Sequence, residues 1–202
     1  MSLIAPMTTT TAKERPILFS GPMVRAILDG RKTQTRRVAR MTEGGHVRLG
    51  PRRWHPADEA AVLASPYGQP GDRLWVRETW QHEDGSCDDH KCGQPTHIYH
   101  KATESFPESM RWKPSIFMPR WASRLTLEVT DVRVQRVQKI TEEDAKAEGV
   151  EPRHAGQGEV GHPIHTYRTG FVYVWHSINA KRGFGWEKNP WVWVIEFTRC
   201  TD

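Results

Sequence analysis

The chain has 202 residues, of which 37% are hydrophobic and 26% charged, a balance typical of a globular domain rather than a disordered or fibrous chain. Its three cysteines are too few for a disulfide framework, and no apolar run approaches the roughly 20 residues that span a bilayer. We therefore expect a cytoplasmic protein with no membrane partner. The formal charge of +5 admits polyanions as partners but does not by itself indicate nucleic acid.

The beginning of the chain predicts a tail and then one domain. Residues 1–14 are expected to form a flexible tail, and residues 15–202 a single domain. Within this domain, residues 15–20 are apolar and predict a first strand. Residues 22–29 predict a short amphipathic helix, which Gly30 ends.

Three polar stretches predict long loop insertions, near residues 39–70, 81–95 and 151–167. The first can hold one short helix around residues 57–63. Loops of this length in a compact domain are usually functional or disordered. Between the first two insertions, residues 73–80 alternate in polarity and predict a strand.

The second half carries the clearest β pattern. Apolar residues alternate over residues 125–137 with a change of phase, which predicts a long bent strand with a bulge near residues 130–131. Residues 191–197 are almost continuously apolar and predict a central strand.

Two further helices are expected in this half. Thr141 and Asp144 have the spacing of a capping box, and Gly149 supplies the helix end. Apolar side chains recur at helical spacing over residues 171–178. The elements together predict an α+β fold, a mainly β barrel with about three peripheral helices.

The most distinctive segment is Gly30-Arg-Lys-Thr-Gln-Thr-Arg-Arg37. If it is extended, Lys32 and Gln34 point to one side and Thr35 to the other, whereas a kink at the helix exit would bring Lys32 and Thr35 together. A basic, solvated turn after a helix is the alternative interpretation.

Three blocks of the sequence, in this order, resemble ASCH domains. Residues 30–37 look like the family's G-x-K-x-x-T-x-R signature, residues 141–149 resemble its later T-E-x-x-A-x-x-E helix, and residues 194–197 match its final V-I-E-F strand. Residues 71–80 and 177–183 are similar to ASCH-containing proteins carried by phages and prophages.

ASCH domains are PUA-like β-barrels, many of which bind RNA, so the resemblance implies this fold and RNA or a nucleoside or nucleotide as partner, in a bacterial or phage-infected bacterial cell. One branch, the N4-acetylcytidine amidohydrolases, removes an acetyl group from a modified base. Carried over by motif, Lys32 would accept the proton, Thr35 would be the nucleophile and Glu148 the proton donor. This chain is longer than those enzymes, and Arg36 stands where an apolar residue is usual.

The ligand-binding residues expected around this motif are Gly30, Arg31, Arg36, Arg37 and Glu78. Arginine side chains would contact phosphates while a base enters the cleft. Glu78, on a predicted strand, is expected to face the pocket and orient Lys32.

A cysteine- and histidine-containing stretch is the only candidate metal site. Cys87, His90 and Cys92, with His97 beyond them, can supply zinc ligands, but the spacing departs from that of zinc ribbons. A polar loop with free thiols is the alternative, and no other cofactor is expected.

Three functions stay open at this point. The first is a module that binds RNA, a nucleotide or a nucleoside in a cleft built around residues 30–37. The second is an enzyme that uses Lys32, Thr35 and Glu148, either an amidohydrolase acting on an acylated nucleoside or a ribonuclease. The third is a phage accessory protein that binds another protein.

Overall fold

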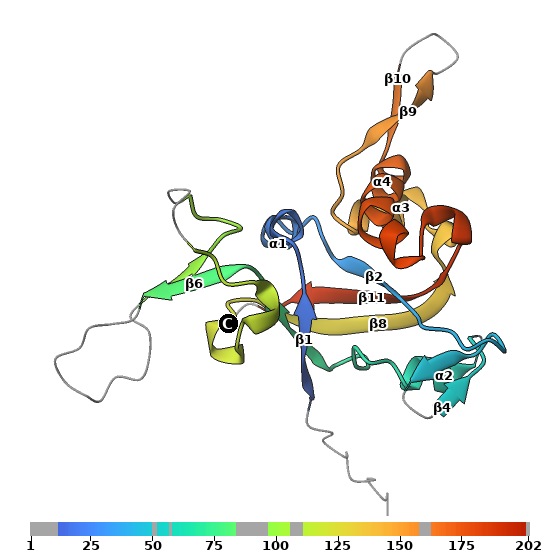
Figure 1. Ribbon diagram of the computed structural model, residues 1–202, viewed down its shortest axis with the longest axis horizontal. Helices are drawn as coiled ribbons and strands as arrows, with labels where there is room; N and C mark the ends of the chain where they lie inside the picture. Colours follow the sequence, from blue (N-terminus) through green and yellow to red (C-terminus); the bar gives the residue numbers. More distant parts are fainter. Residues whose placement is uncertain are drawn as a thin grey trace, which may run out of the picture.

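The computed structural model shows a mixed α+β fold built around a five-stranded sheet (Figure 1). It describes residues 12–49, 52–56, 58–83, 97–105, 111–157 and 163–200. In their order across the sheet, the strands are β1 (Glu14–Leu18), β5 (Arg73–Arg77), β8 (Thr126–Arg136), β11 (Trp191–Arg199) and β2 (Gln34–Val38). β1 and β5 are parallel, and the other neighbours are antiparallel.

The long strand β8 contains the predicted bulge. Glu196 of β11 pairs with Asp131, and the next residue, Phe197, pairs with Val129, so Thr130 is left without a partner. An extra residue of this kind bends a strand and increases its twist. In Figure 1, β8 and β11 run side by side along their length, and β1 runs across their direction.

The first five residues of β11 are all apolar because both faces of this part of the strand are covered. Val192 and Val194 pack with Phe171 and Trp175 in one buried cluster, whereas Ile195 and its alternate neighbours pack in the other. A strand buried on both faces is expected to be a near-continuous apolar run. The prediction that residues 191–197 form a central strand is confirmed.

The described residues include four α-helices: α1 (Gly21–Leu28), α2 (Glu59–Leu63), α3 (Glu142–Ala147) and α4 (Tyr167–Asn179). Single turns of 3-10 helix occur at η1 (Ser115–Phe117), η2 (Arg120–Ala122), η3 (Val137–Lys139), η4 (Ala180–Arg182) and η5 (Trp186–Lys188). None of these helices is long and apolar enough to cross a membrane.

Small antiparallel pairs occupy parts of the expected loop insertions. They are β3 (Val47–Leu49) with β4 (Arg52–Trp54), β6 (Trp80–Glu83) with β7 (His97–His100), and β9 (Arg153–Gln157) with β10 (Pro163–Thr166). β6 and the β9–β10 pair extend away from the main sheet (Figure 1). These stretches therefore contain more regular structure than the sequence indicated.

The two outer strands of the sheet are joined by a side chain. Arg37 of β2 donates from Nη2 to the backbone oxygen of Leu18 of β1, at 2.7 Å. This contact brings β1 and β2 near each other, while closure of the sheet into a barrel stays a prediction. The candidate cleft lies at this junction.

Candidate cleft between the outer strands

A cavity of about 560 Å³ opens where β1 and β2 approach each other. Its walls come from β1 and the start of α1, from β2, from the end of α3, and from α4. Five of the eight residues expected in the site line this cavity, namely Lys32, Thr35, Arg36, Arg37 and Glu148. The structure thus brings the 30–37 segment and the end of α3 together.

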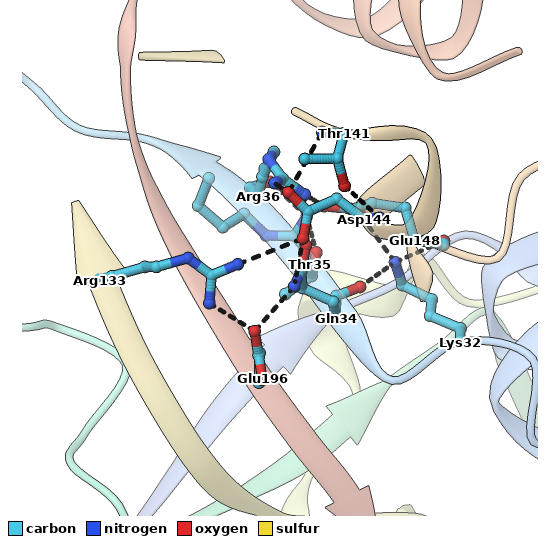
Figure 2. A network of polar contacts seen from close by, with 10 residues as sticks. Lys32, Gln34, Thr35, Arg36, Arg133, Thr141, Asp144, Glu148 and Glu196 are labelled. Carbon is cyan, nitrogen blue, oxygen red and sulfur yellow. Dashed lines mark hydrogen bonds and ion pairs between the residues drawn. The ribbon is translucent and has the colours of Figure 1, made fainter. Parts of the chain in front are cut away.

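Lys32 and Glu148 form the buried centre of the site (Figure 2). They are 3% and 5% exposed, which leaves little room for water to solvate either charge. Lys32 Nζ donates to Gln34 O at 2.7 Å, to Glu148 O at 2.8 Å and to Glu148 Oε2 at 3.0 Å. Burial lowers the pKa of Lys32, although the carboxylate of Glu148 acts in the opposite direction.

Local sequence places Glu148 at this point. The Thr141 hydroxyl accepts from the backbone N–H of Asp144 at 3.0 Å, and the Asp144 carboxylate accepts from the N–H of Thr141 at 3.3 Å. This capping box, as predicted, starts α3, and Gly149 ends it at a φ of +73°. A Cβ on Gly149 would lie 2.7 Å from Lys32 Cβ, so glycine permits the close approach.

Arg36 contacts the same helix through both terminal nitrogens of its guanidinium, whereas its buried Nε has no hydrogen-bond partner among the described residues. Its guanidinium donates to Glu148 Oε1 at 3.1 Å, to Asp144 Oδ2 at 2.8 Å and to the side-chain oxygen of Gln34. Figure 2 shows this network continuing through Arg133, which pairs with Asp144 and Glu196. Each cation here has a carboxylate partner. The network therefore stabilises the floor of the cleft, and its cations are not available to pair with a ligand.

Thr35 is held by Arg37 rather than by Lys32. Arg37 Nη1 donates to Thr35 Oγ1 at 3.0 Å, and the guanidinium lies 5.0 Å from the ring centroid of Phe19. Thr35 is 1% exposed. The described contacts include no hydrogen bond between Lys32 and Thr35, so the proposed base and nucleophile share the cavity without touching.

Besides Arg37, whose contacts are with a hydroxyl and backbone oxygens, three arginines at the cleft have no acidic partner among the described residues. Arg40, Arg77 and Arg182 line the cavity, and no ion pair to a carboxylate joins any of them within the described part of the chain. Arg182 contacts the Asn179 side chain at 3.4 Å. The Arg77 guanidinium lies 4.7 Å from the Trp75 ring centroid, and its buried Nε has no hydrogen-bond partner among the described residues.

Aromatic side chains complete the cleft. Phe19, Tyr67 and Trp175 lie on its walls, supplied by three segments far apart in the sequence. Burial raises the pKa of Tyr67, which keeps its hydroxyl protonated and able to donate a hydrogen bond. Arg77 and Arg182 fall within the blocks 71–80 and 177–183 but were not expected as site residues. Helical and strand periodicity did not indicate the cleft role of these aromatics or of Arg40, because it marks burial but not which distant segments meet.

The other expected ligand-binding residues lie elsewhere. Arg31 is paired with Asp29 and Glu151 on the outside of the fold, and Gly30 forms the turn before it at a φ of +72°. Glu78 is 1% exposed and forms two hydrogen bonds with Arg124, at 2.9 and 3.1 Å. It is not among the residues that line the cleft, where we expected it to orient Lys32.

The expected zinc ligands are only partly covered by the structure. Cys87, His90 and Cys92 lie outside the described residues. His97 is in β7, with its ring centroid 4.4 Å from that of Tyr99. Among the residues that the structure describes, no three potential metal-ligating side chains cluster, and zinc binding stays a prediction.

No family model matches the chain. The comparisons with curated proteins and with solved structures likewise find no match. The resemblance to ASCH domains therefore stays an expectation drawn from the sequence blocks, and the geometry of the cleft is the basis for a functional proposal.

Proposed function

We propose that this protein binds a nucleotide, free or as one unit of RNA, in the cleft between β1 and β2. The proposal depends on one observation: some cations of the cleft form ion pairs with carboxylates and others do not. Lys32 and Arg36 on the floor are neutralised by Glu148 and Asp144, whereas the arginines around them have no carboxylate partner among the residues that the structure describes. Cations left unpaired beside a cavity favour an anionic ligand.

The size and walls of the cleft support this class of ligand. A volume of about 560 Å³ is within the range of small-molecule sites, roughly 300–1,000 Å³. The aromatic walls can stack a base, while Arg40 and Arg182 can bind its phosphate. We also propose, from the resemblance, that the sheet is a PUA-like barrel of the ASCH type and that the protein acts in the bacterial cytoplasm.

Calorimetric titration with cytidine 5′-monophosphate tests the proposal. We expect binding that weakens with salt, and Arg182→Gln should weaken it about tenfold, since a hydrogen bond to a charged group contributes about 1.5 kcal/mol or more. Lys13→Gln is the matched control, because Lys13 is an exposed cation outside the cleft. An unchanged affinity in Arg182→Gln, or no binding at all, would reject the proposal.

A second candidate is deacylation of a modified nucleoside. It is favoured by the burial of Lys32, which lowers the pKa of its ammonium, and by the position of Thr35 and Glu148 in the same cavity. In the reaction, Thr35 Oγ would form a bond to the acetyl carbon and give its proton to neutral Lys32. Glu148, which accepts from Lys32, would pass that proton on to the departing amine as the C–N bond breaks, and water would then hydrolyse the acetyl-threonine.

Hydrolysis of N4-acetylcytidine, followed by chromatography, tests this candidate. Thr35→Val removes the hydroxyl at nearly constant volume and should abolish turnover. Thr33→Val is the control, because Thr33 is exposed and does not line the cleft. Equal turnover in the two variants, or none in the unmodified protein, would argue against this reaction.

A further inference from the structure

A second, larger hollow adjoins the cleft. Its volume is about 1060 Å³, and it is bounded by the end of β2, by η4 and η5, and by the start of β11. Val38, Arg40 and Arg182 line both cavities. The two are therefore neighbouring parts of one surface, with two arginines at the junction.

The charge of this second hollow is of one sign. Its basic residues are Arg40, Arg48, Arg136, Arg182 and Lys188, and no aspartate or glutamate is among the residues that line it. Within the described chain no ion pair joins these five to a carboxylate. The formal net charge of the whole protein is +5, so five cations without acidic neighbours in one hollow show that positive charge is concentrated there.

Aromatic rings accompany these cations. Phe184 and Trp191 line the hollow and are partly exposed. The Arg136 guanidinium lies 4.5 Å from the centroid of the Trp191 ring, and its Nη1 is fixed to Asn189 O at 2.9 Å. A cationic groove with aromatic faces is the usual arrangement for tracking a single-stranded nucleic acid, because bases stack while the phosphates meet the cations.

We propose that the second hollow binds the nucleotides adjacent to the one held in the first, so that the ligand is a single-stranded oligonucleotide rather than a free nucleoside or mononucleotide. This inference rests on the proposed function of the first cleft. One nucleotide places its phosphate at one point and leaves most of the second hollow without counter-charge. A strand carries a phosphate at every step, and its unpaired bases are free to stack.

Fluorescence anisotropy with labelled oligocytidylates, from dinucleotide to octanucleotide, tests this inference. Affinity should rise with length until both hollows are filled and then level off. Arg48→Gln/Lys188→Gln should weaken octanucleotide binding at least tenfold and reduce the slope of log affinity against log salt by about 0.7 for each lost phosphate contact. The same variant should bind cytidine 5′-monophosphate as the unmodified protein does.

Lys13→Gln/Arg73→Gln is the matched control. It removes the same charge just before β1 and at the start of β5, outside both hollows, and should leave octanucleotide affinity nearly unchanged. Mononucleotide binding without any gain in affinity for longer strands would overturn this inference and leave the proposed function intact. So would equal losses in the two double variants, or equal affinity for heparin fragments of similar charge. Absence of binding to both mononucleotide and oligonucleotide would remove both proposals.

Discussion

The ammonium of Lys32 donates to the carboxylate of Glu148 at 3.0 Å, although 116 residues separate them in the chain. Glu148 also accepts from Arg36, so one buried carboxylate joins two cations of the 30–37 segment to the end of α3. The floor of the cleft exists only when these two distant segments meet. Stability and the shape of the site are therefore expected to change together.

Glu148→Gln tests this coupling. The substitution keeps the size of the side chain but leaves Lys32 with no carboxylate partner while buried, and breaking a buried pair on one side costs about 3 kcal/mol or more. We expect the free energy of unfolding in urea to fall by about this amount. Glu143→Gln, an exposed change on the same helix, should stay within about 0.5 kcal/mol. Equal stability of the two variants would contradict the coupling.

Two glycines of similar backbone conformation allow the stability cost of left-handed backbone strain to be measured apart from the cost of a steric clash. Gly30 and Gly149 have φ values of +72° and +73°, and a Cβ on Gly30 would meet nothing within 4 Å. At Gly149 it would lie 2.7 Å from Lys32 Cβ and 2.8 Å from Ala26 Cβ. In both alanine variants, left-handed strain should lower the free energy of unfolding by about 1 kcal/mol. Gly149→Ala should lower it further because of the clash with Lys32 and Ala26.

The thermal unfolding midpoints of Gly30→Ala and Gly149→Ala give this comparison directly. Because the clash displaces Lys32, Gly149→Ala should also weaken nucleotide binding, whereas Gly30→Ala should not. Matching midpoints and affinities would show that the approach of Gly149 to Lys32 has no energetic consequence.

Local signals predicted much of this geometry. The capping box at Thr141, the stop at Gly149 and the bulge at Thr130 all depend on a few adjacent residues, and the structure contains each of them. Sequence blocks also placed Lys32 and Glu148 in one site. The cap, the helix end and the bulge could be predicted because a short stretch of chain determines each of them, whereas the pairing of Lys32 with Glu148 followed only from the resemblance of two distant sequence blocks.

The residues that form the walls of the cleft could not be predicted from local sequence signals. Tyr67, Arg77 and Arg182 come from three separate segments, and each would pass for an ordinary surface or core residue in its own segment. Glu78 was expected beside Lys32, but its partner is Arg124. The inward or outward direction of a strand residue follows from alternation, whereas its partner depends on how the sheet curves.

Acid stability should depend on Asp144. Burial alone would raise the pKa of Asp144, but the charge of Arg36 and the hydrogen bonds from Gln34 and Thr141 outweigh it and lower the pKa below its ordinary 3.8. A carboxyl with a depressed folded pKa stabilises the fold above its unfolded pKa, and this contribution is lost as the pH falls through the folded value.

Urea unfolding measured at a series of pH values below about 4 checks this dependence. Asp144→Asn should flatten the decline of the unfolding free energy with falling pH, besides lowering stability at neutral pH. Glu143→Gln is the control for loss of one negative charge on α3. A decline as steep in Asp144→Asn as in the unmodified protein would contradict this role of Asp144.

The most direct test of the central claim is to locate a bound nucleotide. Photocrosslinking with 4-thiouridine 5′-monophosphate, followed by mass spectrometry of peptides, should give adducts on peptides that contain Phe19, Tyr67 or Trp175, and excess cytidine 5′-monophosphate should suppress them. Adducts concentrated instead around the exposed Phe117 and Trp121, or adducts that the competitor does not suppress, would contradict nucleotide binding in the cleft between β1 and β2.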